Sequence, residues 1–206
     1  EAVVAQPVGG PGSSGPGAAV DLTDPAATTA LVAELRPHMI VHLAGFSSVG
    51  LGGARTDLVW RNNFDATRNL AQAASALAPG SRFIFASTAE VYGRSFNDGP
   101  RDEDAAPAPA SAYGRSKMAS EYALTDLASK LDVVILRLFN HTGPGQSEAF
   151  VVPALAAQLA RLDPTGQGQV RVGNLSAQRD FTDVDDIVEA YIAVLLDPLG
   201  APGVHT

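Results

Sequence analysis

The 206-residue chain contains no cysteine, only two lysines and no long apolar run. Without cysteine it forms no disulfide and performs no thiolate chemistry, which fits a reducing compartment and predicts a cytoplasmic protein. No apolar segment approaches the roughly 18 residues that a membrane-spanning helix needs, so no membrane partner is expected. A net charge of −8 argues against a nucleic-acid surface, whereas a nucleotide ligand needs only a few local cations.

A metal centre is not expected either. His42 and His141 have no carboxylate or third histidine at ligand spacing, so packing or a place at the substrate rim explains them better. The acidic residues at 183, 185 and 186 stand where a helix is expected to begin, and there they interact favourably with the helix dipole.

Strand-like and helix-like segments alternate along the first two thirds of the chain. Continuous apolar runs at residues 39–44, 82–86 and 132–138 predict buried strands, and a short strand is expected at residues 1–5. Helices are predicted from Asp24 to about residue 36, over 56–77 and over 111–130. Buried strands that alternate with helices are typical of an α/β fold with a doubly wound, parallel, Rossmann-like sheet.

The pattern changes near residue 150. We expect a helix over 151–162, a short strand over 170–172, and a last helix that Thr182 caps and that ends near residue 196. The sequence therefore predicts two parts: a Rossmann-like domain at residues 1–149 that lacks its first strand–helix unit, and a partial substrate lobe at residues 150–206. The last helix could pack back on the sheet.

Polar residues follow three of the predicted strands. They are residues 42–48, Ser87 with Thr88, and Asn140 with His141. Because ligands bind beyond the carboxyl ends of parallel strands, these clusters predict one ligand-binding rim.

Tyr113 and Lys117 are four residues apart, so on a helix they share one face. A nearby ammonium favours the phenolate, and we therefore expect Lys117 to lower the pKa of Tyr113. With a hydroxyl from Thr88 to hold the substrate oxygen, this makes a proton-transfer site for a carbonyl/alcohol pair. The spacing alone is a weak signal, because such pairs occur by chance on surface helices.

These segments, taken in order, resemble the extended short-chain dehydrogenase/reductase family, the NAD-dependent sugar epimerases and dehydratases. The resemblance covers nearly the whole chain. It rests on Asp21-Leu22, His42 to Gly45, Asn62-Asn63, Ser87 to Gly93, Tyr113 to Lys117, and Arg137 to Asn140. Later segments look most like GDP-6-deoxy-D-mannose reductases, with GDP-mannose 4,6-dehydratases as second choice: Phe139 to Gln146, Phe150-Val151, Val172 to Leu175, and Arg179 to Val184.

The resemblance implies roles for individual residues. Thr88, Tyr113 and Lys117 would be the catalytic triad, and Glu90 stands where dehydratases carry a base for water elimination. The residues implied to bind NAD or NADP are Asp21, Leu22, Leu43, Ala44, Gly45, Asn63, Tyr113, Lys117 and Leu138. Those implied to bind a nucleotide-sugar are Ser87, Asn140, Val172, Asn174, Leu175 and Arg179, with Arg179 on the diphosphate. A homodimer through the helices at 56–77 and 111–130 is also implied.

One family feature does not match. The family seats the cofactor pyrophosphate on a glycine-rich turn between its first strand and helix, and residues 10–15 match G-x-G-x-x-G only as a string of letters. Prolines stand beside these glycines, and Asp21-Leu22 follows them rather than an amphipathic helix, so we interpret the string as a linker. The chain then resembles the middle of a longer enzyme, and a non-catalytic binding or assembly protein stays open as an alternative.

Overall fold

The computed structural model describes residues 2–3, 20–46, 55–163, 165, 167–196 and 203–205. The glycine string at 10–15 and the serines at 47 and 48 lie outside these ranges. The helices and strands are β1 (Ala2–Val3), α1 (Pro25–Leu35), β2 (Met39–His42), α3 (Thr56–Trp60), α4 (Ala66–Leu77), β3 (Arg82–Ala86), α5 (Ala112–Thr125), β4 (Asp132–Leu136), β5 (Asn140–Thr142), α6 (Val151–Ala160), β6 (Phe181–Asp183), α7 (Val184–Leu196) and β7 (Gly203–His205). None of these helices is long and apolar enough to cross a membrane.

The structure divides into two compact units, Glu1–Leu138 with Leu199–Thr206, and Phe139–Pro198. The division falls before the expected boundary at 149/150, and strand β7 near the C-terminus belongs to the first unit. Five parallel strands form the sheet of that unit, in the order β1-β2-β3-β4-β7. The predicted α/β fold with a parallel sheet is thus confirmed.

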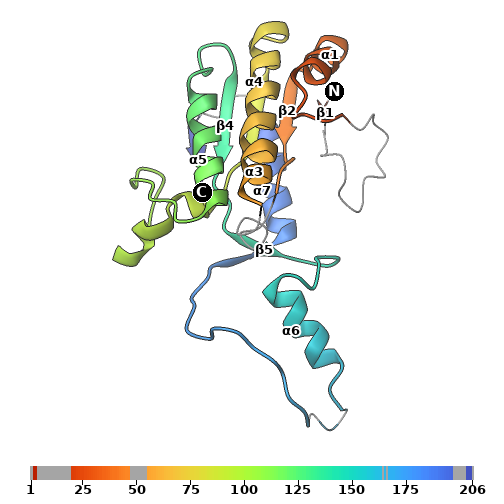
Figure 1. Cartoon of the computed structure of the whole chain (residues 1–206), viewed down its shortest axis with the longest axis vertical. Helices are drawn as coiled ribbons and strands as arrows, with labels where there is room; N and C mark the ends of the chain where they lie inside the picture. The colour runs from red at the N-terminus through yellow and green to blue at the C-terminus, as the bar shows by residue number, and fades with distance from the viewer. Residues whose placement is uncertain are drawn as a thin grey trace. The chain divides into compact units, whose positions relative to one another are not determined.

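Helices α4 and α5 lie side by side across one face of this sheet (Figure 1). Parallel pairing places Ile40 opposite Phe83, and Phe83 opposite Val133. These three side chains belong to one buried cluster with Leu70 of α4. Ile84 and Val134, which alternate to the other face, are also buried, as expected for a parallel sheet that is covered on both faces.

Local sequence explains where the first helix begins and ends. The Asp24 carboxylate accepts hydrogen bonds from the backbone N–H groups of Ala26 and Ala27, at 2.8 and 3.2 Å, and Pro25 occupies the first helical position. At the other end Arg36 adopts a left-handed conformation with φ 41°. The cap predicted at Asp24 is confirmed.

The helix predicted over 56–77 is interrupted. A π-helical turn, Arg61–Asp65, separates α3 from α4. The carbonyl of Asn63 in this turn accepts hydrogen bonds from the hydroxyls of Thr67 at 2.6 Å and Ser120 at 3.1 Å. Such turns often mark functional sites, because they redirect a side chain within a helix.

The second unit departs from two predictions. Residues 170–172 form no strand, and the two strands of this unit are β5 and β6, which pair in parallel from Asn140 opposite Phe181. The last helix begins at Val184, and Asp183 rather than Thr182 accepts the N–H of Asp185, at 2.9 Å. The sequence patterns missed β5 and β6 because each has only three residues.

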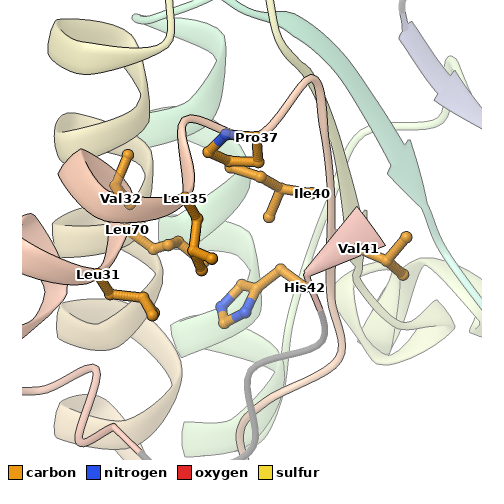
Figure 2. Close-up of a pocket in the computed structure, with 8 residues that line it drawn as sticks. All are labelled: Leu31, Val32, Leu35, Pro37, Ile40, Val41, His42 and Leu70. Carbon is orange, nitrogen blue, oxygen red and sulfur yellow. The ribbon is translucent and has the colours of Figure 1, made fainter. Parts of the chain in front are cut away.

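His42 is fully buried in the core of the first unit. Its imidazole stacks on Phe85 at 5.8 Å, and its ring points toward a small apolar pocket lined by Leu31, Leu35 and Leu70 (Figure 2). The Thr67 hydroxyl donates to Asn63, so it accepts from Nε2 of His42 at 2.8 Å. Nδ1 is then an unprotonated acceptor, and it has no partner among the described residues.

Burial, with a smaller effect of the Lys117 charge, lowers the pKa of His42 to about 3. Between pH about 3 and 6.5 the unfolded chain binds a proton there that the folded chain does not. The folded state therefore loses stability as the pH falls through this window. Between pH 7 and pH 4 we expect the free energy of unfolding of His42→Leu to fall by roughly 3 kcal/mol less than that of the wild type. Urea unfolding at pH 7 and pH 4 measures it, and the exposed His38→Leu is the control. Equal acid sensitivity in His42→Leu and the wild type would contradict the assignment.

Candidate active site

The candidate site lies at the carboxyl end of β3, in the first unit. Ser87 and Thr88 follow this strand directly, and both are nearly buried. Tyr113 and Lys117 of α5 are also buried, and α5 packs on the short helical turn Ala89–Val91 and on β4. The structure thus brings together Thr88, Tyr113 and Lys117, which the sequence combined in one proton-transfer site, with Ser87 beside them.

Thr88, Glu90 and Tyr113 form the polar end of the site. The Thr88 hydroxyl accepts the backbone N–H of Glu90 at 3.2 Å, and it lies close enough to the Tyr113 phenol to lower the pKa of that group. A Cβ added at Gly114 would lie 2.7 Å from the Glu90 carbonyl oxygen, so only glycine lets α5 approach this turn so closely. The close approach fixes Tyr113 beside Thr88.

The pKa of Tyr113 is raised above its usual value of 10. Burial is the main cause, the hydrogen bond with Thr88 lowers the pKa, and the negative charge of Glu90 raises it again. The expected lowering by Lys117 is therefore wrong in its net direction. Helical spacing predicts that the two side chains share a face, but burial of the phenol decides the sign.

Lys117 points its ammonium at the end of β3. Its Nζ donates to the carbonyl oxygen of Ala86 at 2.7 Å and lies 4.7 Å from the centre of the Phe85 ring. Burial lowers the pKa of Lys117 to about 8, although the charge of Glu121 opposes this shift. At neutral pH the side chain is thus a buried ammonium, and its loss of hydration destabilises the folded state.

A turn at the end of β2 forms the neighbouring part of the rim. Leu43 is half exposed, Ala44 is buried, and Gly45 has φ 141°. Asn63 Oδ1 accepts the N–H of Phe46 at 2.7 Å, and a Cβ on Gly45 would lie 2.7 Å from the same oxygen. Asn63 therefore holds this turn through its side chain, while its Nδ2 donates to Ser116 of α5 at 3.1 Å.

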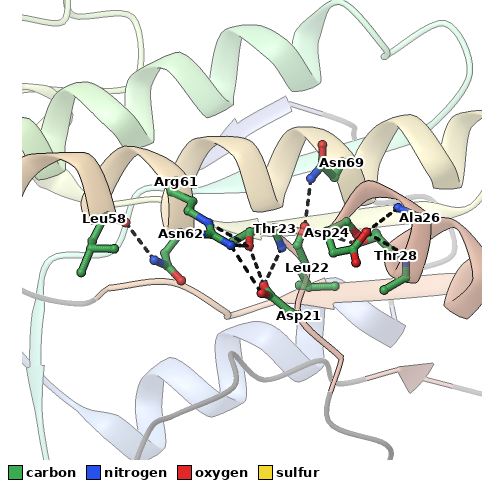
Figure 3. Close-up of polar contacts among 11 residues, drawn as sticks. Asp21, Leu22, Thr23, Asp24, Ala26, Thr28, Leu58, Arg61, Asn62 and Asn69 are labelled. Carbon is green, nitrogen blue, oxygen red and sulfur yellow. Dashed lines mark hydrogen bonds and ion pairs between the residues drawn. The ribbon is translucent and has the colours of Figure 1, made fainter.

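Asp21 and Leu22, two of the residues implied to bind the cofactor, have contacts within the protein in this structure (Figure 3). The Asp21 carboxylate accepts the Thr23 hydroxyl at 2.7 Å and pairs with Arg61 at 3.7 Å. Hydrogen bonds from the hydroxyl and N–H of Thr23 lower the pKa of Asp21. The Leu22 side chain belongs to the core, and its carbonyl accepts from Asn69 at 3.0 Å. Leu138 binds the N–H of Ala89 through its carbonyl at 2.9 Å.

The residues implied to bind the sugar nucleotide, apart from Ser87, belong to the second unit. They are all exposed to solvent: Asn140, Val172, Asn174, Leu175 and Arg179. The Arg179 guanidinium donates to the carbonyl of Gln178, its own neighbour, at 2.7 Å. The Asn174 side chain binds Ser176. These local contacts leave the proposed roles of the five residues as predictions.

Sequence reasoning missed a buried cluster behind the strand ends. Ser87 donates to Glu121, which also pairs with Arg137 at 2.8 Å, and all three side chains are buried. Glu121 stands one helical turn beyond Lys117, on the same face, and that spacing was the available signal. Across the described residues, no group of three His, Cys, Asp or Glu side chains could hold a metal ion.

The chain matches the NAD dependent epimerase/dehydratase family over residues 7–204 and belongs to this family. Among curated relatives, the GDP-6-deoxy-D-mannose reductase of Pseudomonas aeruginosa is 34% identical over 179 residues, which cover 85% of this chain and 59% of that protein. A GDP-mannose 4,6 dehydratase of Caenorhabditis elegans is 30% identical over 85% of this chain and 47% of its own length.

The fold is also similar to solved structures of nucleotide-sugar enzymes. The structure of RMD from Pseudomonas aeruginosa complexed with NADPH superimposes with a TM-score of 0.80 at 32% identity, covering 92% of this chain and 65% of that one. A UDP-glucuronic acid 4-epimerase from Bacillus cereus, in complex with UDP-glucuronic acid and NAD, gives 0.73 at 27% identity, with 86% and 55% covered. The chain spans less than two thirds of the length of these relatives.

Burial of Lys117 predicts a stability effect. A pKa depressed from 10.5 to about 8 costs the folded state about 3 kcal/mol at neutral pH. Between pH about 8 and 10.5 Lys117 keeps its proton in the unfolded chain but loses it in the folded one. The stability of the wild type should therefore rise as the pH increases through this window. Lys117→Met removes the cost of burying the charge but also removes the hydrogen bond to Ala86. We therefore expect the variant to be more stable than the wild type by roughly 1–3 kcal/mol at pH 7.

Urea unfolding at pH 7 and at pH 10.5 measures this difference, which should shrink at the higher pH. The exposed Lys130 is the other lysine of the chain, and Lys130→Met is the matched control. A Lys117→Met variant that is less stable than the wild type at pH 7 would show that the ammonium is well paired in the fold.

Proposed function

We propose that this chain carries the catalytic part of an enzyme that uses NADPH or NADH to reduce a nucleotide-sugar of the GDP-4-keto-6-deoxy-mannose type. The observation that carries the proposal is that Thr88 and the Tyr113 phenol are both buried at the end of β3, one helical turn from Lys117, whose ammonium donates to the Ala86 carbonyl. The relative that acts on a GDP-6-deoxy-mannose, at 34% identity, supports the substrate class. A cytoplasmic location stays a prediction of the cysteine-free composition.

Tyr113 would act as the general acid. Its raised pKa keeps the phenol protonated at neutral pH, so it has a proton to donate to the keto oxygen of the sugar. Thr88 would hold that oxygen in reach through its hydroxyl. The Lys117 ammonium would stabilise the phenolate that forms when the proton leaves, and it is charged at neutral pH because its pKa is about 8.

The strand ends fit a nicotinamide dinucleotide in part. Gly45, with φ 141°, presents a backbone without a Cβ at the end of β2, where a ligand can approach closely, and Lys117 offers a cation to a ribose. A bound nicotinamide supplies the hydride of the reduction. No residue in the described part of the chain is assigned to the pyrophosphate, and the glycine string at 10–15, interpreted as a linker, lies outside that part.

The second unit would hold the sugar nucleotide. Arg179 offers a planar fork of donors that matches a diphosphate. Its side chain is exposed and donates to the carbonyl oxygen of Gln178. Asn140 offers an amide at the start of β5, and Val172, Asn174 and Leu175 offer an exposed stretch for the base.

A 4,6-dehydratase or epimerase is the alternative within the same class. Glu90 supports it, because this carboxylate lies close enough to Tyr113 to raise its pKa and could act as the base in a water elimination. A non-catalytic binding or assembly partner is the alternative from another class. It predicts that the chain neither binds the cofactor nor consumes it.

Tyr113→Phe tests the proposed acid. The chain has one tryptophan, Trp60, whose fluorescence can be followed as NADPH is added. With NADPH and GDP-4-keto-6-deoxy-mannose, we expect the wild type to consume the near-ultraviolet absorbance of NADPH. Tyr113→Phe should lose roughly 10²–10⁴-fold in kcat, because the proton donor is gone, while cofactor binding changes little. The exposed Tyr122→Phe on the same helix is the matched control.

Three outcomes separate the candidates. Turnover that survives in Tyr113→Phe rules out the assigned acid. Conversion of GDP-mannose without net consumption of NADPH favours the dehydratase. No binding of NADPH at millimolar concentration, in the chain as it stands, favours the non-catalytic alternative.

A homodimer through α3, α4 and α5 is part of the proposal. Tyr122 supports it, because this aromatic side chain is 62% exposed on α5 and would be covered in such an interface. We expect Tyr122→Glu to shift the protein from dimer to monomer in sedimentation analysis. A monomeric wild type, or a variant that dimerises as the wild type does, would remove α5 from the interface.

A further inference from the structure

Three elements of the first unit, α5 and the ends of β3 and β4, meet at one buried carboxylate, that of Glu121. The side chain stands on α5, one turn beyond Lys117, and is 2% exposed. It accepts a hydrogen bond from the hydroxyl of Ser87, which follows β3. It also pairs with Arg137, which follows β4, through Nη2 at 2.8 Å and Nε at 3.2 Å.

Arg137 extends this cluster to the loop beyond the site. Its Nη1 donates to the Tyr92 hydroxyl at 3.2 Å and to the Glu103 carbonyl at 3.1 Å, and its guanidinium lies 5.0 Å from the Tyr92 ring centre. Burial opposes the charge of Arg137, but bonds to Glu121 and Tyr92 outweigh it and raise its pKa. The guanidinium therefore stays charged and keeps Glu121 in place.

We propose that Glu121 is a positioning residue of the site, which anchors the Ser87–Thr88 turn to α5 and keeps a fixed negative charge one helical turn from the Lys117 ammonium. Each contact acts on a group that the proposed reaction uses. The bond to Ser87 holds the residue before Thr88, and the charge favours the protonated form of Lys117. The inference rests on the proposed function, because positioning has a meaning only if Tyr113 and Thr88 act on a substrate.

In the described part of the chain, few other charges near Lys117 could do this. On its own helix it has Glu121 and the neutral Tyr113 phenol, and from β3 the Phe85 ring and the Ala86 carbonyl face it. His42 of β2 is neutral, since its pKa is about 3. Glu121 is the charge that raises the pKa of Lys117 against the effect of burial. Without it, a larger fraction of Lys117 would be an uncharged amine at neutral pH.

Because the chain has two lysines, the pKa of Lys117 can be measured without any substrate. In protein labelled with ¹³C at the lysine ε-carbon, NMR gives one titration for Lys117 and one for the exposed Lys130. We expect the pKa of Lys117 to fall by roughly one unit in Glu121→Gln, with Lys130 unchanged. Ser87→Ala, which removes the hydrogen bond and leaves the charge, should leave the pKa of Lys117 where it is.

The exposed Glu34→Gln is the matched control, and it should move neither lysine. If Glu121→Gln does not fold, since it leaves Arg137 buried without its partner, Glu121→Gln with Arg137→Met removes both charges together. We expect the pKa of Lys117 to fall in this double variant as well. A Lys117 pKa that stays at its wild-type value in the folded variant overturns the proposal.

Turnover gives the second readout. Activity should decline as the pH rises through the pKa of Lys117, and in Glu121→Gln this decline should move to lower pH by about the shift that NMR measures, while KM for NADPH changes little. A variant with lower kcat but an unmoved pH profile would show a purely structural effect and overturn the proposal. If the wild type itself lacks turnover, the proposed function fails, whereas the NMR titration still decides whether Glu121 acts on Lys117.

Discussion

A lysine ammonium buried at the end of β3 is the constraint on which the first unit depends. Lys117 is 4% exposed, and a buried charge is tolerated only where it is paired or hydrogen-bonded. Its partners are the Ala86 carbonyl, the Phe85 ring and, one helical turn away, Glu121. Since parallel pairing sets Phe85 opposite His42, the same charge helps to keep the imidazole neutral inside the core.

Small residues on α5 let this charge approach the sheet. Gly114 lies against the Glu90 backbone, while Ser116 and Ser120 lie against the π-helical turn and share hydrogen bonds with Asn63. Larger side chains at these positions would push α5 away from the strand ends. The close placement of Tyr113, Thr88 and Lys117 thus follows from the close packing of α5 against the neighbouring backbone. The hydroxyls of Ser116 and Ser120 allow this packing and also form hydrogen bonds with buried polar groups.

The sequence predicts the parts of this arrangement that depend on local pattern. The apolar runs of β3 and β4, the cap at Asp24 and the spacing of Tyr113 and Lys117 are all local, and each is confirmed in the structure. The π turn is not predictable in this way, because the hydroxyls that bind the Asn63 carbonyl include Ser120 of another helix. The predicted shift of the Tyr113 pKa had the wrong direction for a similar reason. Helical spacing determines which side chains lie close together, whereas burial depends on the whole fold.

The pKa shifts of Tyr113 and Lys117 have a consequence for the direction of the proposed reaction. Burial makes Tyr113 keep its proton and makes Lys117 release its proton more readily, so both values favour the less charged form of each group. At neutral pH the pair is a phenol beside an ammonium, the state that can donate a proton to a carbonyl. Oxidation of an alcohol would require the phenolate, which burial and Glu90 disfavour. In the proposed enzyme, this charge state would favour reduction of a carbonyl over oxidation of an alcohol.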